Sequence, residues 1–235
     1  MISAARTHIG KVRASNQDAL LVHPGKYGLY GVADGMGGHK AGDVASKMAV
    51  SVVERALKDA RPSADKLRTA IQEANLMIYE EQLGNPDYNG MGTTMTVIWE
   101  DGNRILLGHV GDSRAYRIRK NEIRQVSLDH SMVAEMVRNG YLTEWEARVH
   151  PYRNIITRAL GTDDSVEVDV DILDKRKGDI FLLCSDGLSE YVLPEQMIKV
   201  TQHNSLEKAV EILLNLALEG GGRDNISVVL AEVTA

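Results

Sequence analysis

Apolar residues recur along this chain with two periods, and the changes of period divide it into predicted helices and strands. Helical spacing over 43–60, in the segment after Pro62, and over 205–218 predicts amphipathic helices. Ser63 and Ser205 stand where an N-cap residue is expected. Short apolar or alternating runs bounded by turn residues predict strands. These runs cover residues 2–8, 19–22, 27–33, 94–99, 104–110, 113–119, 122–126, 166–173, 180–184 and 226–233.

Two short turns predict how the central strands are connected. Asp101-Gly102 is typical of a tight hairpin, and Lys120-Asn121 joins its flanking strands just as closely. Links this short allow only antiparallel neighbours, because a parallel pair needs a long crossover connection. We therefore interpret residues 94–126 as an antiparallel meander and not as a β-α-β unit.

The least regular part of the chain is residues 129–157. It contains two short helical patterns, Met132–Arg138 and Glu144–Val149, the second capped by Thr143. A helical insertion of this kind is a substrate-facing flap in some proteins and surface decoration in others. No linker, repeat or low-complexity segment interrupts the chain, so we expect a single domain over 1–235 with an insertion at about 129–157.

Composition restricts the class of protein. The 235 residues are 43% hydrophobic, which suffices for one substantial core, and the net charge of −6 argues against a nucleic-acid partner. The single cysteine, Cys184, cannot form an internal disulfide and favours a reducing compartment. Residues 1–18 contain no apolar core of signal-peptide length, and no run approaches the roughly 20 apolar residues of a membrane helix. We expect a cytoplasmic monomer that binds neither nucleic acid nor membrane.

Four aspartates beside turn residues are the strongest chemical signal. In Leu29–Ser46 an apolar strand ends on Asp34, a glycine cluster follows, and a helical pattern then begins. Asp186 repeats this pattern, and Asp18 and Asp224 also adjoin turns. Oxygen ligands suit Mg²⁺ and Mn²⁺, which keep several waters, whereas zinc ligands are missing because there is one cysteine and no HExxH motif. The acids therefore predict a divalent-cation site.

Charge also favours metals at these acids. Clustered carboxylates repel a phosphate dianion, whereas two divalent ions cancel their charge and lower the pKa of a shared water for in-line attack. The sequence lacks the residues that other phosphate-binding or phosphate-transfer sites require. A dinucleotide fingerprint would need glycine where Lys40 stands, and no P-loop is present. A cysteine nucleophile would need arginine where Glu190 stands, so Cys184 is interpreted as a core residue, and no DxDGT motif follows Asp169.

A series of short motifs resembles the metal-dependent protein serine/threonine phosphatase family (PPM, type 2C), in particular its bacterial members. The motifs occur in the family's order and span nearly the whole chain. They are RASNQD at 13–18, VADGMGGHKAGDVAS at 32–46, GTTMT at 92–96, GHVGDSRAYRIR at 108–119, LDHS at 128–131, RALG at 158–161, LLCSDGL at 182–188 and GRDNISVVL at 222–230.

The resemblance implies a fold and a metal centre. The fold is α+β, an antiparallel β-sandwich flanked by helices on both sides in four α-β-β-α layers, with a small helical flap. The centre binds two Mn²⁺ or Mg²⁺ ions at one end of the sandwich. By position, Asp34 bridges the ions and the carbonyl of Gly35 completes one of them. Asp186 and Asp224 hold the other ion, and Asp18 holds metal-bound water.

The resemblance also assigns residues around the ions. Arg13 would bind the substrate phosphate, and Asp112 together with Asp186 matches a third, weaker metal site. Animal relatives carry a histidine two residues after the bridging aspartate, where this chain has Met36. The nearby His39 is suited to protonating the departing seryl or threonyl oxygen, or else is a surface residue of the glycine loop. Asn225 is expected to brace its turn.

The resemblance implies hydrolysis of phosphoserine and phosphothreonine in proteins by a metal-activated water, without a phosphoenzyme. Phosphoproteins would be the substrates, and a serine/threonine kinase would be the opposing partner. Two other functions stay open from the sequence. One is hydrolysis of small phosphoesters at the same metal centre, and the other is a catalytically silent regulator that binds phosphoproteins.

Overall fold

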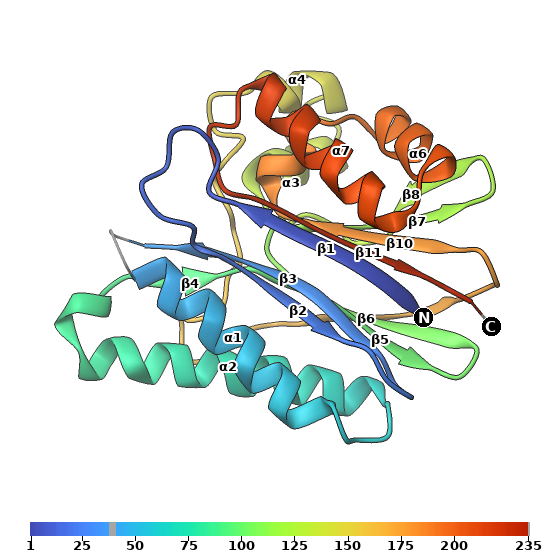
Figure 1. Cartoon of the computed structure of the whole chain (residues 1–235). Coiled ribbons are helices and arrows are strands. Elements are labelled where there is room, and N and C mark those ends of the chain that lie inside the picture. The colour runs from blue at the N-terminus through green and yellow to red at the C-terminus, as the bar shows by residue number, and fades with distance from the viewer. Residues whose placement is uncertain (38–40, 235) are drawn as a thin grey trace.

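The computed structural model describes residues 1–37 and 41–234, and it has four layers (Figure 1). Two antiparallel sheets face each other, and helices cover the outer face of each. The helices are α1 Ala41–Leu57, α2 Ala64–Gly84, α3 Met132–Arg138, α4 Glu144–Val149, α5 Asp186–Ser189, α6 Pro194–His203 and α7 Leu206–Gly220, with a 3-10 turn η1 at Pro86–Tyr88. The strands are β1 Ile2–His8, β2 Asp18–His23, β3 Leu29–Met36, β4 Gly92–Thr93, β5 Met95–Asp101, β6 Arg104–Val110, β7 Arg114–Arg119, β8 Glu122–Gln125, β9 Asp169–Asp174, β10 Ile180–Cys184 and β11 Ile226–Glu232.

The strand order confirms the sandwich that the family resemblance implies. One sheet, here called the β11 sheet, has the order β1-β11-β10-β7-β8. The other, called the β3 sheet, has the order β2-β3-β5-β6-β9, and β4 pairs with β3. Helices α1 and α2 pack on the β3 sheet, and α7 packs on β1 and β11. The fold is therefore α+β in four layers.

The meander predicted for residues 94–126 is wrong at one step. The hairpins β5–β6 and β7–β8 form as predicted, with Gly102 and Lys120 at positive φ in their turns. Strands β6 and β7, however, belong to different sheets. The chain crosses between the sheets at Gly111, whose φ of 110° is open to glycine but strained for other residues. Periodicity could not distinguish this crossing from a hairpin.

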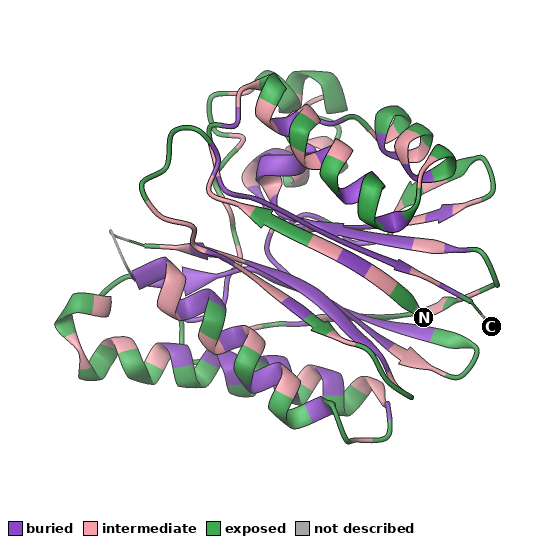
Figure 2. Ribbon diagram, in the orientation of Figure 1, coloured by how far each residue is buried: buried purple, intermediate pink, exposed green. Residues whose placement is uncertain are grey.

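Three apolar layers alternate with the sheets and helices (Figure 2). Strand β3 contributes side chains to two of these layers, because successive side chains of a strand point to opposite faces. Leu29 and Ala33 face α1 and α2, whereas Tyr30 and Val32 lie between the sheets. The layer between the β11 sheet and α5–α7 includes Cys184, as predicted for a core residue.

The predicted element limits need small corrections. Strand β3 begins later than predicted and continues past Asp34, because β4 extends its pairing at Gly35 and Met36. Strand β9 begins at Asp169, so the alternating residues 166–168 precede it. Helices α5 and α6 were not predicted from the apolar pattern. The caps Ser63, Thr143 and Ser205 are confirmed by hydrogen bonds to their helices.

The sequence predicts no membrane-spanning segment. Among the described residues, no helix combines the length and apolar character that crossing a bilayer requires.

A buried histidine makes the stability of this fold dependent on pH. His109 on β6 is 1% exposed, donates from Nε2 to the carbonyl of Leu128 at 3.0 Å, and contacts Thr96 Oγ1 at 2.9 Å. Burial, and then the neighbouring His130, lower the pKa of His109 to about 4. The unfolded chain, with an ordinary histidine pKa, therefore takes up this proton first as pH falls.

We expect the free energy of unfolding to fall between pH 6.5 and 4 by about 2 to 4 kcal/mol through His109 alone. The stabilisation is fully present above pH 6.5 and is lost below it. Urea unfolding at pH 7 and pH 5 measures this loss, and His109→Gln should reduce it. His203→Gln, at an exposed position of α6, is the matched control and should leave the pH dependence unchanged. Equal acid sensitivity of wild type and His109→Gln would contradict this prediction.

Candidate metal centre

The predicted acids lie where the apolar layer between the sheets ends. On β3, Asp34 continues the stripe of Tyr30 and Val32. The antiparallel register places Asp18 of β2 directly opposite Asp34, so their side chains emerge on the same face. The two carboxylates therefore lie on the face of β2 and β3 that carries apolar side chains elsewhere along these strands.

The β11 sheet contributes the opposite wall of the site. After β10 ends, Ser185 Oγ donates to Asp18 Oδ2 at 2.8 Å and accepts from the backbone N–H of Ser227 at 3.0 Å. Asp186 follows as the first residue of α5. The serine thus connects the two sheets at the site and delivers Asp186 to the same end of the sandwich as Asp34.

Asp224 and Arg13 meet at the exposed rim. Arg13 Nη2 lies 2.6 Å from Asp224 Oδ2, and the other carboxylate oxygen accepts from the N–H of Asn225 at 2.8 Å. The Arg13 side chain is 53% exposed, so it reaches both solvent and the acids. The structure brings the predicted phosphate-binding arginine to the acidic site, next to a predicted metal ligand.

Asn225 braces the chain around Arg13, as predicted. Its side-chain amide donates to the carbonyls of Ile9 and Ser15 at 2.9 and 3.0 Å, and its Oδ1 accepts from the N–H of Gln17 at 2.7 Å. One side chain therefore fixes the loop that carries Arg13 relative to Asp224.

Asp112 completes the set at the crossing from β6 to β7. The neighbouring Ser113 Oγ lies 2.7 Å from Thr94 Oγ1, and this threonine oxygen accepts from the N–H of Asp34 at 2.9 Å. The turn of Asp112 is thus linked to the backbone of the central acid. His39, the proposed proton donor, lies outside the described residues.

The carboxylates repel one another strongly. Burial raises the pKa of Asp34 well above its ordinary value, and nearby negative charges raise it further. Burial, and then repulsion from neighbouring acids, also raises the pKa of Asp186 well above its ordinary value. Burial also raises the pKa values of Asp18 and Asp112 to about 6, although hydrogen bonds from Ser227 and Ser185 oppose the change at Asp18. The acids that act on Asp34 in this way are Asp18, Asp186, Asp112 and Asp224.

These residues fit a divalent cation. The buried Oδ1 atoms of Asp18 and Asp186 have no hydrogen-bond partner among the described residues, and a cation satisfies such oxygens. No three carboxylate, imidazole or thiol groups of the described chain converge tightly enough to hold an ion alone. Mg²⁺ and Mn²⁺ do not require three converging side chains, because backbone carbonyls and water supply the remaining ligands.

Two glycines allow the backbone to approach closely here. A Cβ atom at Gly35 would lie 2.0 Å from the carbonyl oxygen of Gly42, at the start of α1. A Cβ atom at Gly187 would lie 2.0 Å from the carbonyl oxygen of Asn225. Gly35 and Gly187, which follow Asp34 and Asp186 directly, are therefore packing requirements, because they bring α1 and the Asp224 turn against the acids.

Sequence reasoning missed several residues that hold the site together. The pattern of residues does not single out Ser185, Ser227 or Thr94, because small hydroxyl residues in or next to strands are common. Asp169 belongs to the alternating run over 166–173, which predicts no partner for it, but its carboxylate lies 3.1 Å from His130 and 2.8 Å from Arg158. The LDHS and RALG motifs were the available signal for these two partners.

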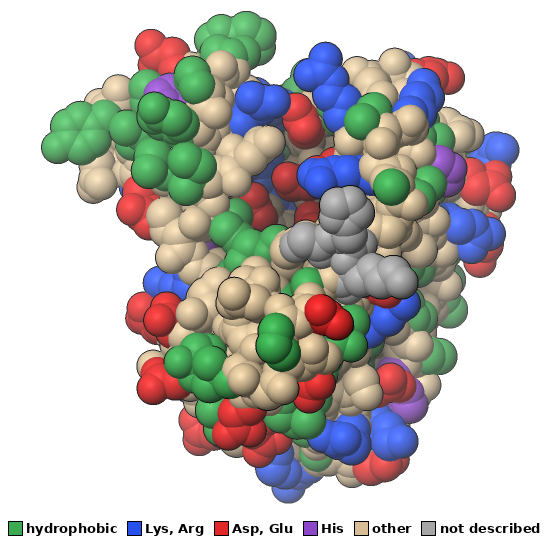
Figure 3. All heavy atoms as spheres, turned by 90° about the vertical axis from the view of Figure 1, so that its left-hand side faces the viewer, with side chains coloured by type: hydrophobic (Ala, Val, Ile, Leu, Met, Phe, Trp, Pro, Cys, Tyr) green, Lys and Arg blue, Asp and Glu red, His purple; other side chains and the backbone are tan. Residues whose placement is uncertain are grey.

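A groove leads from the acids along the segment predicted as a flap. Its volume is about 650 Å³, and Asp112 and Asp186 line one end. Helices α3 and α4 and the β7–β8 hairpin line the rest. The space-filling view shows the hollowed face, with acidic side chains inside and basic ones near its rim (Figure 3). The insertion at 129–157 therefore borders the site.

A sandwich of this architecture, with buried acids and an exposed arginine at one end, defines a candidate centre for divalent cations and phosphate. The sequence matches the family model described as protein phosphatase 2C over residues 6–223. The chain belongs to the protein phosphatase 2C family.

Two curated relatives show how much of each protein is shared. Serine/threonine protein phosphatase PstP of Mycobacterium tuberculosis is 42% identical over 233 residues, covering 98% of this chain and 44% of PstP. Serine/threonine phosphatase stp of Listeria welshimeri is 39% identical over 236 residues, covering 97% of this chain and 94% of that protein. The chain thus spans less than half the length of PstP but nearly all of stp.

Solved structures confirm the fold. The crystal structure of the M. tuberculosis phosphatase PstP/Ppp has a TM-score of 0.93 at 40% identity, covering 100% of this chain and 99% of that one. A structure of the PstP catalytic domain in complex with two manganese ions has a TM-score of 0.90 at 39% identity, covering 100% and 98%.

The raised pKa values predict proton release on metal binding. Near pH 6 the acids, including Asp18 and Asp112, hold protons that a cation must displace. We expect Mn²⁺ titration at pH 6 to release about one proton or more, and the affinity to fall about 10-fold or more from pH 7.5 to 6. Calorimetry in two buffers of different ionisation enthalpy measures this release. Asp65→Asn, at an exposed acid of α2, is the control, and binding without proton release would contradict the expectation.

Proposed function

We propose that this protein is a serine/threonine protein phosphatase that uses two Mn²⁺ or Mg²⁺ ions, with Asp112 and Asp186 able to hold a third, weaker ion. One observation supports this most directly. Mutually repelling carboxylates from both sheets converge beside Arg13, and buried oxygens of Asp18 and Asp186 have no other partner among the described residues. Two relatives that are named serine/threonine phosphatases agree with this proposal.

Each residue has a role in this proposal. Asp34, Asp186, Asp224 and the Gly35 carbonyl would hold the ions, and Asp18 would orient water from its buried position. Bound ions would neutralise the acids and supply a water of lowered pKa as the nucleophile. Arg13 binds the phosphate oxygens, because its guanidinium offers paired donors. His39 protonates the departing hydroxyl oxygen, as proposed from the sequence.

The surroundings of the site favour protein substrates. The groove of about 650 Å³ extends far beyond one phosphate group. Large apolar side chains are exposed on the flap, including Tyr141 at 76% and Trp145 at 73%. Exposed aromatic residues beside a site are typical of protein recognition. Small phosphoesters would use little of this surface, and a silent regulator would not need every acid to be kept.

The partners follow from the proposed reaction. Proteins carrying phosphoserine or phosphothreonine are the substrates, and a serine/threonine kinase that produces them is the opposing partner. We also propose that the chain acts as a monomer, because all the acids of the site come from one chain.

Removing one central acid tests the reaction. We expect Asp34→Asn to lower kcat on a phosphothreonine peptide with Mn²⁺ by about 1,000-fold, the size of several kcal/mol of transition-state stabilisation. EDTA should abolish turnover in the wild type. Asp171→Asn, on β9, is the control and should retain activity. Full activity of Asp34→Asn, or of the EDTA-treated enzyme, would refute the proposed metal role. Absence of both turnover and metal binding would favour the silent regulator.

The flap surface tests the substrate class. We expect Trp145→Ala to raise KM for a phosphoprotein about 5-fold or more, because truncating an interface aromatic residue typically removes over 1 kcal/mol. Turnover of a small aryl phosphate should be unchanged. Leu83→Ala, equally exposed on α2, is the matched control. Faster hydrolysis of sugar phosphates than of phosphopeptides by the wild type would instead support the small-molecule function.

A further inference from the structure

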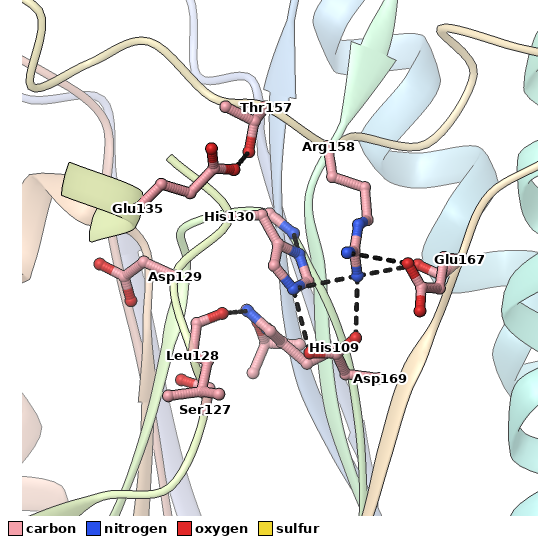
Figure 4. A network of polar contacts seen from close by, with 12 residues as sticks. His109, Ser127, Leu128, Asp129, His130, Glu135, Thr157, Arg158, Glu167 and Asp169 are labelled. Carbon is pink, nitrogen blue, oxygen red and sulfur yellow. Dashed lines mark hydrogen bonds and ion pairs between the residues drawn. The ribbon is translucent and has the colours of Figure 1, made fainter. Parts of the chain in front are cut away.

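His130 lies at the base of the flap, among side chains that come from four separate parts of the chain (Figure 4). It is 5% exposed. Its ring faces Asp169 of β9 and Arg158, and it stacks at a tilt on His109 of β6 with ring centroids 4.8 Å apart. Such a buried histidine outside the acid cluster needs a separate explanation.

The two ends of the flap pair through the backbone at this residue. The carbonyl of His130 accepts from the N–H of Thr157 at 2.8 Å, and the carbonyl of Ile155 accepts from the N–H of Met132 at 2.9 Å. Ser131 pairs with Ile156 between these bonds. The flap is therefore closed at its base by a short antiparallel ladder that begins at His130.

The same residue is bonded twice to the turn of Asp112. The N–H of His130 donates to the carbonyl of Gly111 at 2.8 Å, and the N–H of Gly111 donates to His130 Nδ1 at 3.0 Å. Gly111 is the residue at which the chain crosses between sheets, and Asp112 follows it directly. One histidine thus contacts the flap base and the backbone that carries an acid of the site.

The neighbours fix the tautomer of this histidine. A backbone N–H can only donate, so Nδ1 must accept from Gly111 and carries no proton. Nε2 therefore carries the proton and donates to Asp169 Oδ2 at 3.1 Å. Arg158 Nη1 also lies 3.2 Å from His130 Nε2. Both nitrogens are donors, and Arg158 Nη1 donates instead to Asp169 Oδ1 at 2.8 Å.

We propose that His130 is the positioning residue that couples the flap, residues 129–157, to the Gly111-Asp112 turn. Its effect on turnover rests on the proposed phosphatase function, whereas the coupling itself is a property of the fold. The neutral Nε2–H form makes all of these bonds. Protonation at Nδ1 would place two donors face to face and release the Gly111 amide.

The charged groups around His130 favour the neutral form on balance. Burial lowers its pKa first, the hydrogen bond to Asp169 raises it, and Arg158 and Arg138 lower it. His109 is neutral at the same pH, because its own pKa is about 4. At neutral pH the coupled arrangement is therefore the populated one.

Amide hydrogen exchange of His130→Leu tests the coupling without any need for activity. We expect the amides of Gly111, Met132 and Thr157 to exchange about 10-fold or more faster, the effect of losing a buried hydrogen bond. Amides of β11 should be unchanged. His130→Asn keeps an acceptor for Gly111 and should restore slow exchange at that amide. His203→Leu is the control variant. Exchange at wild-type rates in a folded His130→Leu variant would overturn the proposal.

Wild-type protein provides a test that does not depend on a variant folding. Nitrogen-15 NMR of the imidazole at pH 7 should show His130 as the Nε2–H tautomer, with Nδ1 unprotonated. An Nδ1–H or doubly protonated ring would overturn the proposal.

Kinetics then separates the coupling from the function. His130→Leu should raise KM for a phosphopeptide about 10-fold. The change in kcat for a small aryl phosphate should be smaller. His130→Asn should recover part of the loss. Equal loss on both substrates would indicate damage to the metal centre and contradict coupling through the flap. Absence of activity in the wild type would refute the phosphatase function but leave the exchange and tautomer tests decisive.

Discussion

Repulsion between carboxylates held in one buried layer is the constraint on which the rest of this structure depends. Asp18 and Asp34 are direct cross-strand neighbours, an arrangement that destabilises a sheet when both carry charge. Unit charges about 4 Å apart repel by about 4 kcal/mol at an effective dielectric constant of about 20. The fold can keep such a cluster only because three apolar layers stabilise the sheets that hold it.

The sandwich serves this constraint by dividing the acids between its sheets. Asp34 comes from the β3 sheet, whereas Asp186 follows a strand of the β11 sheet. The hydroxyl of Ser185 spans the gap to Asp18, and Arg13 supplies one positive charge at the rim. Arg114, which also acts on Asp112, is already paired with Asp129, so the two arginines cannot neutralise all of these carboxylates. The remaining charge must be met by protons or cations, which is why pKa values rise here and why the same site suits divalent metals.

Local features of the fold were predictable from the sequence, and long-range contacts were not. The caps Ser63, Thr143 and Ser205 and the Asp101-Gly102 turn depend on neighbouring residues, so their patterns sufficed. The bond from Ser185 to Asp18 joins residues 167 positions apart, and no periodicity indicates it. The crossing at Gly111 was misread for the same reason, because a three-residue link reads as a turn whether or not the chain changes sheet. Family motifs, not spacing, gave the roles of the acids.

The flap shows a different balance between local and distant contacts. Its helices are short, none of the described residues of α4 is buried, and α3 buries Val133. The flap therefore gains little stability from a core of its own. The contacts at its base, where the backbone ladder and the buried His130 lie, hold the flap in position relative to the acids. Surface residues of the flap can consequently change with substrate while Asp112 remains in place, because the anchoring contacts do not involve that surface.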